Sequence, residues 1–264
     1  MAASFTFTHA ICRTPSISSV DGLRAVDTGA PDLATFRAHH ADYVAALRAT
    51  GANVTLLDAL EDFPDSTFVE DAALCLPKGA VIMRPGAPSR LGEAAAIRPA
   101  IEAAYGPHMR QISGPGHIEG GDILVTEREI LVGKSARTDA AGVWELRAIV
   151  SDWGYTLREL QTPPDVLHFK TDCSLLDADT ILTTRRLAAS GCFDGYDLIY
   201  TEDGEDASAN AIRFNDAVLF PAGFPRTAAA LDRAGYNVVE IGNSEAAKLD
   251  GGMSCLSLRF SPPT

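Results

Sequence analysis

The chain has 264 residues, of which 46 % are apolar and 22 % charged, an ordinary composition for a globular protein with a sizeable core. Its formal net charge of −13 repels phosphate backbones and argues against nucleic acid as a partner, and no run of about 18 apolar residues predicts a membrane span. We expect a cytoplasmic protein, because the start lacks a secretory signal pattern and the five widely spaced cysteines form no CxxC pair.

A helix-like stretch rich in alanine, followed by a glycine and an extended apolar run, recurs along the chain. The copies span residues 36–58, 94–112, 142–160 and 226–242, with a weaker one at 191–202. Alanine, leucine and arginine favour a helix, and glycine is typical of the left-handed residue at which a helix ends. The apolar run after each glycine predicts a strand. The glycines are Gly51, Gly106, Gly154, Gly195 and Gly235.

Pairs of short apolar runs alternate with these copies. They lie at 71–85, 121–133, 173–184 and 210–221, with turn residues inside the pairs, and a fifth pair is split between the two ends of the chain. The repeating unit is thus hairpin, helix and strand, and five units use the whole sequence. We expect one domain over residues 1–264, closed into a ring, because an open stack would leave exposed edges.

The residues that begin each hairpin are of special interest, because equivalent positions of a ring meet near its axis. Glu70 and Glu119 are 49 positions apart, and Glu119 and His168 are again 49 apart. Cys255 follows His168 by 87 positions, which is close to two of the shorter repeats. Carboxylates, a histidine and a cysteine thus fall at matching positions of the repeat.

These side chains match the needs of nucleophilic catalysis by a thiol. A cysteine with its usual pKa of about 8.5 needs a base or a cationic neighbour to react, and histidine is the usual partner. We assign Cys255 as the nucleophile, His168 as the general acid/base and Glu119 as the carboxylate that orients the imidazole. Gly251 and Gly252 precede the thiol and allow a close approach of the backbone.

Glu70 and Asp71 interrupt an apolar strand start, and buried carboxylates need partners. A guanidinium cation is a suitable partner, because its N–H groups donate to two or more carboxylate oxygens at once. The acidic surface would also favour the approach of a cationic small molecule. The four remaining cysteines are interpreted as small buried residues.

The sequence resembles the guanidine-modifying pentein superfamily and, within it, the dimethylarginine dimethylaminohydrolases. The resemblance covers nearly all of the chain, in order from Leu23 to the C-terminus, and implies an α/β fold, a five-bladed α/β propeller of ββαβ repeats around a pseudo-fivefold axis. The segments that carry it are Phe68–Asp71, Arg84–Arg90, Glu119–Asp122, Ser135–Thr138, Leu167–Lys170 and Asp250–Cys255.

This resemblance implies hydrolysis of Nω-methylated arginines to citrulline and dimethylamine or methylamine, through a thiouronium on Cys255 and without a metal or organic cofactor. Arg84 and Arg137 are expected to bind the α-carboxylate of the substrate, and residues 16–27 to form a mobile lid. A thiolate beside a histidine could also bind zinc as an inhibitor. The substrate-binding residues that the resemblance implies are Leu23, Asp65, Phe68, Glu70, Asp71, Arg84, Arg137 and Leu249.

Two alternatives stay open at this point. The same chemistry could act on arginine or Nω-hydroxyarginine, since arginine deiminases, hydroxyarginine hydrolases and amidinotransferases share the fold, although the short chain lacks room for the helical insertion of the deiminases. A non-enzymatic pentein that binds a macromolecule is disfavoured by the Cys255, His168 and Glu119 set. We expect an arginine-like small molecule as the partner, and the sequence leaves the oligomeric state open, a homodimer included.

Overall fold

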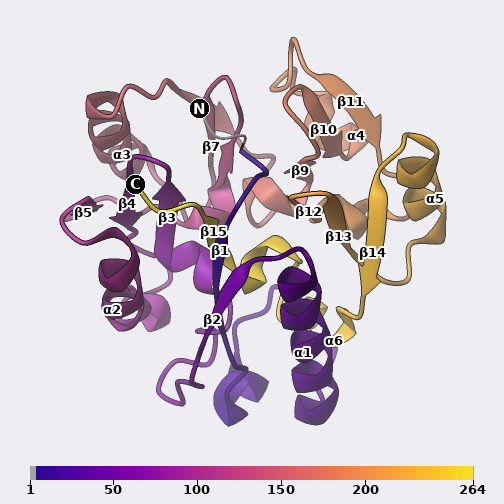
Figure 1. Ribbon diagram of the computed structural model, residues 1–264, viewed down its shortest axis with the longest axis horizontal. Coiled ribbons are helices and arrows are strands. Elements are labelled where there is room, and N and C mark those ends of the chain that lie inside the picture. The colour runs from indigo at the N-terminus through magenta and orange to yellow at the C-terminus, as the bar shows by residue number, and fades with distance from the viewer. Residues whose placement is uncertain (1–3, 264) are drawn as a thin grey trace.

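A ring of five small sheets forms the framework of the protein (Figure 1). The computed structural model describes residues 4–263, and within them each sheet has three strands. In every sheet the middle strand pairs antiparallel with one neighbour and parallel with the other, and in every sheet a helix connects the two parallel strands. The predicted unit of hairpin, helix and strand is therefore confirmed.

The bounds of the elements follow the five units in chain order. The first sheet holds β1 (His9–Arg13), α1 (Leu33–Ala49), β2 (Asn53–Leu57) and the last strand, β15 (Leu258–Phe260); the second holds β3 (Ala73–Leu76), β4 (Gly79–Ile82), α2 (Glu93–Tyr105) and β5 (Met109–Gln111). The third holds β6 (Ile123–Val125), β7 (Ile130–Lys134), α3 (Ala140–Asp152) and β8 (Leu157–Gln161). The fourth holds β9 (Cys173–Leu175), β10 (Thr180–Thr183), α4 (Arg185–Ala188) and β11 (Asp197–Tyr200); the fifth holds β12 (Ile212–Phe214), β13 (Ala217–Pro221), α5 (Pro225–Arg233) and β14 (Asn237–Ile241), followed by α6 (Ser244–Ala247).

Local sequence explains where these elements begin and end. Asp32 caps α1 by accepting from the backbone N–H of Thr35 at 2.8 Å. The weaker fourth copy of the repeat has a helix of only four residues, α4. All five of the predicted glycines adopt positive φ angles, for example 88° at Gly51 and 92° at Gly235, as a left-handed turn after a helix requires.

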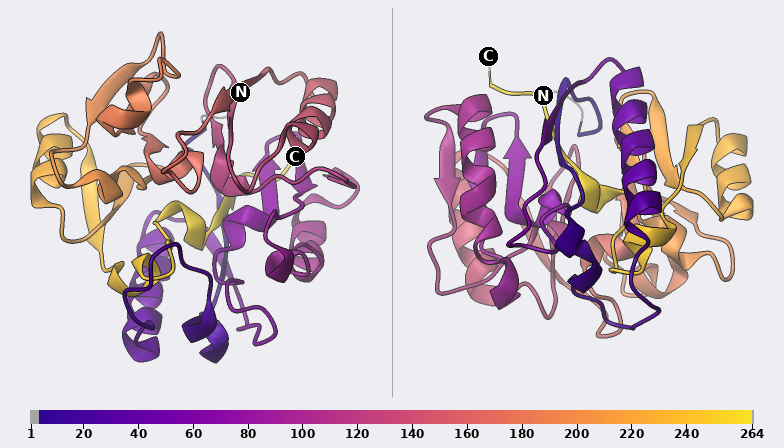
Figure 2. Two further views of the ribbon diagram at one scale, coloured as in Figure 1. Left: turned by 180° about the vertical axis from the view of Figure 1, so that it is seen from behind. Right: turned by 90° about the horizontal axis from the view of Figure 1, so that it is seen from below.

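The ring is closed by the two ends of the sequence. β15 pairs antiparallel with β1, so that His9 lies opposite Phe260, and β1 pairs in parallel with β2. Both ends of the described chain consequently lie on the same side of the molecule (Figure 2). The fifth hairpin, split between the termini in the sequence, is thus complete in the fold.

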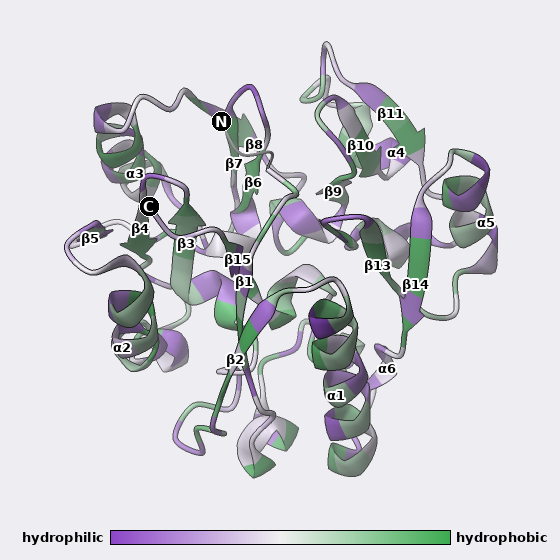
Figure 3. Ribbon diagram, viewed as in Figure 1, coloured by the Kyte–Doolittle hydropathy of each residue, from purple (hydrophilic) through white to green (hydrophobic). Residues whose placement is uncertain are grey.

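The innermost strand of each sheet lies next to the ring axis, and a short 3-10 turn precedes each of them. These turns are η2 (Val69–Ala72), η4 (Gly120–Asp122), η5 (Phe169–Thr171), η6 (Asp206–Ala209) and η7 (Ser254–Leu256), while η1 (Ile17–Asp21) and η3 (Pro88–Arg90) lie elsewhere in the chain. Middle strands such as β13 are buried along their whole length, whereas the outer strand β14 has two exposed polar residues, Asn237 and Glu240 (Figure 3). Among the described helices, none is long and apolar enough to cross a membrane.

Candidate active site

A small hollow of about 30 Å³ lies at the end of the ring where the 3-10 turns meet. Eight of the residues predicted for the site line it: Leu23, Asp65, Phe68, Asp71, Arg137, His168, Leu249 and Cys255. Four further residues line it that were not assigned to the site from the sequence: Arg90, Leu167, Asp250 and Gly251. The side chains of Asp71, His168 and Cys255 thus converge in this hollow, because η2, η5 and η7 begin at the same end of the ring axis.

Cys255 belongs to η7 and is 8 % exposed. Its Sγ accepts from the backbone N–H of Gly252 at 3.4 Å. Burial, reinforced by the carboxylates of Glu70 and Asp71, raises the pKa of the thiol to about 12. A Cβ at Gly251 would lie 2.3 Å from the Phe68 ring, so the predicted close approach of the backbone before the thiol is present.

His168 stands at the start of η5 and contacts a fully buried carboxylate. Its Nε2 lies 2.6 Å from Oε2 of Glu119. Burial acts to lower the pKa of His168, but the carboxylates of Asp71, Asp122 and Glu119 outweigh it and raise the pKa to about 9. The other oxygen of Glu119 accepts from the backbone N–H of Gly86 at 2.8 Å, which holds the carboxylate toward the imidazole.

Asp71 has the second buried carboxylate of the hollow. Its Oδ2 accepts from Nη1 of Arg90 at 2.6 Å, and its Oδ1 accepts from the backbone N–H of Gly121 at 2.8 Å. Burial opposes ionisation, yet His168 and Arg90 lower the pKa of Asp71 to about 2. A Cβ at Gly121 would come within 2.9 Å of both Asp71 and His168, so glycine is needed for the acid and the imidazole to lie this close.

Glu70 does not face the hollow, contrary to the prediction that it would help to bind a guanidinium. Its Oε1 accepts from Nζ of Lys170 at 2.5 Å and from Nη2 of Arg259 at 2.6 Å, and its Oε2 accepts from Oγ of Ser254 at 2.8 Å. The physical reason is the geometry of the 3-10 turn η2, which directs the side chains of successive residues to different sides. The buried carboxylate is therefore already satisfied by protein donors.

Arg84 lies outside the hollow as well, and Arg90, six residues later, is the second arginine that lines it. The guanidinium of Arg84 donates to the carbonyls of Pro115 and Gly116 at 3.1 and 3.2 Å. Arg90 is 4 % exposed and binds both Asp71 and Glu93. The three-residue spacing between Arg90, in η3, and Glu93, the first residue of α2, was a signal in the sequence that could have identified Arg90.

The segment 16–27, predicted as a mobile lid, is joined to the rim of the hollow by several hydrogen bonds. The backbone N–H of Leu23 donates to Asp65 at 3.0 Å, and that of Ala25 donates to Asp250 at 2.6 Å. Glu61 accepts from the start of the segment in the same way. Segment 16–27 also has exposed apolar side chains: Ile17 is 64 % exposed and Val26 69 % exposed. The mobility of this segment stays a prediction.

Three side chains of the site could also hold a metal ion. Asp71, Glu119 and His168 each offer a ligand atom within 4.8 Å of the others. Nε2 of His168 is engaged by Glu119, however, and Asp71 is engaged by Arg90, so an ion would compete with both pairings. The arrangement fits an acid, a base and a thiol that act on an organic cation better than it fits a resident metal.

The comparisons with known proteins agree with this geometry. Residues 49–259 match the family described as arginine deiminase. The chain is 39 % identical over 254 residues to the N(G),N(G)-dimethylarginine dimethylaminohydrolase of Pseudomonas aeruginosa, covering 96 % of this chain and 100 % of that protein. The protein of the same name from Streptomyces coelicolor is 34 % identical over 220 residues, which is 83 % of each chain.

A solved structure of the Pseudomonas aeruginosa protein, a mutant complexed with citrulline, has the same fold. It superimposes with a TM-score of 0.94 over 97 % of this chain and 100 % of that one, at 39 % sequence identity. The predicted five-bladed α/β propeller is therefore confirmed.

Proposed function

The chain belongs to the arginine deiminase family, and we propose that it hydrolyses Nω-methylated arginines to citrulline and dimethylamine or methylamine. The observation that carries the proposal is the meeting of Cys255, His168 and Asp71 in one hollow, with Glu119 2.6 Å from the imidazole. A buried carboxylate beside a buried thiol suits a flat organic cation. The relatives' names and the citrulline bound to one of them support this choice of substrate.

We place the guanidinium of the substrate against Asp71, whose carboxylate lies next to His168. The α-carboxylate would then bind to Arg137, which is 20 % exposed at the side chain, with Arg90 as the second cation of the hollow. Asp65 and the segment at Leu23 would contact the amino-acid end of the substrate. Arg90 takes the place that was first given to Arg84.

The first chemical step is the addition of the Cys255 thiolate, whose proton has passed to solvent on substrate binding, to the guanidinium carbon. His168, which is protonated at neutral pH because its pKa is about 9, gives its proton to the departing amine. The C–N bond breaks, and a thiouronium remains on Cys255 while His168 becomes neutral. Glu119 keeps the imidazole oriented throughout.

In the second step water attacks the thiouronium carbon and gives a proton to the neutral His168. The bond between the sulfur and the substrate carbon breaks, the second proton of the water passes to the sulfur, and citrulline is released, which leaves Cys255 as a thiol and His168 protonated. Both steps use only water and the side chains of this chain.

The ionisation of the thiol is the main energetic obstacle. A pKa of about 12 leaves Cys255 protonated at neutral pH in the free protein. A cationic substrate beside the sulfur would lower this pKa, because an opposite charge within about 6 Å favours the thiolate. The substrate would thus activate its own nucleophile.

The experiment that tests the proposal offers arginine, Nω-hydroxyarginine, monomethylarginine and asymmetric dimethylarginine in parallel and measures citrulline. We expect turnover of the methylated substrates, and none in a Cys255→Ser variant that still binds them. Faster turnover of arginine or hydroxyarginine would assign the chain to the alternative substrates. Citrulline release by the serine variant would contradict the assignment of the nucleophile.

Three broader features are part of the same proposal. We infer that residues 1–264 form one pentein domain, for which a single cooperative unfolding transition is the test. All five cysteines are free, which supports a reducing, cytoplasmic location, and cell fractionation would test it. A homodimer is the assembly we propose, and light scattering on the purified protein would decide it.

A further inference from the structure

A second cavity, larger than the catalytic hollow, does not coincide with it. It measures about 210 Å³, against about 30 Å³ for the hollow. Residues of all five innermost strands, β3, β6, β9, β12 and β15, line it, together with residues at both ends of the described chain. Since the 3-10 turns of the hollow precede these strands, the cavity lies toward the other end of the ring axis.

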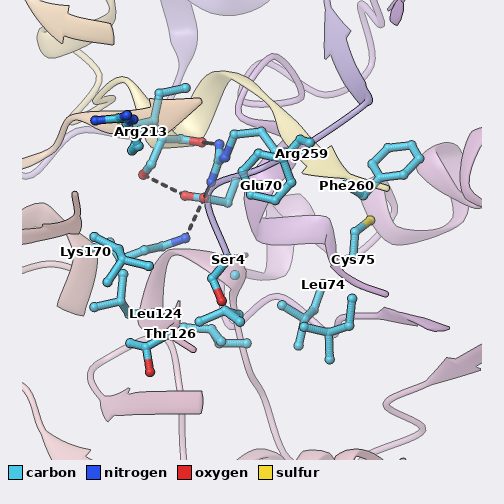
Figure 4. A pocket seen from close by; sticks show the side chains of 18 of the residues that line it. Ser4, Glu70, Leu74, Cys75, Leu124, Thr126, Lys170, Arg213, Arg259 and Phe260 are labelled. Carbon is cyan, nitrogen blue, oxygen red and sulfur yellow. Dashed lines mark hydrogen bonds and ion pairs between the residues drawn. The ribbon is translucent and has the colours of Figure 1, made fainter. Parts of the chain in front are cut away.

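The floor of this cavity carries more positive than negative charge. The ammonium of Lys170 and the guanidinium of Arg259 converge on one carboxylate, that of Glu70 (Figure 4). Lys170 is 8 % exposed and Glu70 4 % exposed, so solvent screens these charges little. Arg128 and Arg213 also line the cavity, as do the acids Glu127 and Glu129. Four basic residues thus face three acidic ones, and the lining has one positive charge in excess.

Several polar groups of the lining have hydrogen-bond donors that are not used within the described chain. Arg259 uses three of its five N–H groups, since it also donates to the carbonyls of Ser254 and Ser257 at 2.8 Å. Nζ of Lys170 has three N–H groups and donates to Glu70 alone among residues 4–263. Ser174 is 4 % exposed, and its Oγ has no hydrogen-bond partner within the described chain. A buried hydroxyl without a partner costs free energy unless a ligand or water satisfies it.

The walls of the cavity are apolar. Leu74, Leu124 and Phe260 surround it (Figure 4), and each is at most 8 % exposed. A volume of about 210 Å³ has room for several water-sized groups. The cavity thus combines a cationic floor with room for a short hydrocarbon chain.

We propose that this cavity binds a short aliphatic monocarboxylate, whose carboxylate accepts hydrogen bonds from Lys170 and Ser174 and whose chain lies against Leu74, Leu124 and Phe260. A cation would be repelled by Lys170 and Arg259. A phosphate dianion would bring more charge than the floor lacks, and it would leave the apolar walls in contact with water. A monocarboxylate supplies the missing charge and buries the walls as well.

Calorimetric titration of the whole chain with straight-chain acids from acetate to octanoate tests the proposal. Citrulline is present at saturation, so that the cations of the catalytic hollow are occupied. We expect the affinity to rise about fourfold for each methylene group, up to roughly five chain carbons, and then to level off or fall. Alkylamines of the same lengths are the control and should not bind.

Two variants assign the binding to this cavity. Lys170→Met should weaken the binding of hexanoate about tenfold or more, and Ser174→Ala, which removes no hydrogen bond of the described fold, about threefold. Lys134→Met is the matched control, since Lys134 pairs with Glu159 outside the cavity, and it should bind hexanoate as the parent does. Three results would each overturn the proposal. One is competition of hexanoate with citrulline, and another is binding of hexanoate no tighter than that of acetate. The third is binding of hexanoate to Ser174→Ala and Lys170→Met as tightly as to the parent.

Discussion

Glu70 and Asp71 are neighbours in the chain, yet their carboxylates line cavities at opposite ends of the ring. Asp71 lies beside His168 and Arg90, whereas Glu70 binds Lys170. Two adjacent residues therefore line different cavities, one the catalytic hollow and the other the larger cavity. The two acids should respond differently when each is replaced by its amide.

We expect Asp71→Asn to lower kcat/KM by about 100-fold, because the guanidinium of the substrate loses its anionic partner. Glu70→Gln should instead act mainly on stability and cost about 3 kcal/mol, since it leaves Lys170 and Arg259 buried without their counter-ion. Steady-state kinetics and urea unfolding of both variants check this. Equal losses of kcat/KM in the two variants would contradict the division of roles.

Replacement of Glu119 by glutamine should shift the pH dependence of the reaction. The pKa of His168 is about 9, against an ordinary value of 6.5, and Glu119 is among the causes. The proton donor of the parent should therefore be lost only above about pH 9, whereas in Glu119→Gln the falling limb should move to lower pH and kcat should drop about 100-fold or more. A pH profile of kcat measures both. If the falling limb of the pH profile did not move, Glu119 would not be a cause of the raised pKa of His168.

The same pairing predicts how stability depends on pH. A pKa that is raised in the folded state means that protonated His168 stabilises the fold fully below about pH 6.5, and that this stability is lost as the pH rises through about 9. The difference in unfolding free energy between the parent and Glu119→Gln should hence be larger at about pH 6 than at about pH 10. Urea unfolding at the two pH values measures it. A difference that grew with pH would have the wrong sign.

The thiol of Cys255 should react slowly with iodoacetamide at neutral pH, because its pKa is raised to about 12. An unreactive cationic arginine analogue should lower the pH at which the thiolate appears. The absorbance of the thiolate, followed against pH with and without the analogue and corrected with Cys255→Ser, measures this shift. A titration that did not respond to saturating analogue would exclude activation by the substrate.

Arg90 and Arg84 offer a matched pair of substitutions. Arg90→Met should destabilise the fold by about 3–5 kcal/mol and reduce activity, since it leaves Asp71 and Glu93 as buried carboxylates without their partner. Arg84→Met should leave the KM for the substrate close to that of the parent, because Arg84 contacts backbone carbonyls outside the hollow. Substrate kinetics and unfolding midpoints compare them. A larger rise of KM in Arg84→Met would restore the prediction made from the sequence.

The repeat made much of the fold and part of the site predictable. A fixed spacing placed Glu119 and His168 at equivalent turns, and the two side chains lie in contact. The direction of a side chain in such a turn depends on the backbone angles, which cannot be predicted from the spacing of the repeats. For this reason Glu70 was expected in the catalytic hollow, although it lines the larger cavity. The larger cavity could not be predicted, because it exists only where five strands from distant parts of the chain meet.

The closure of the ring by β15 and β1 has a consequence for folding. Contacts between residues so far apart in sequence form late, because the entropy of closing the intervening loop must be overcome first. Cys255 lies three residues before β15, on the segment that makes this closing contact. During refolding, we expect helix content to return before activity does, so that the ability to turn over substrate reports the completion of the whole ring.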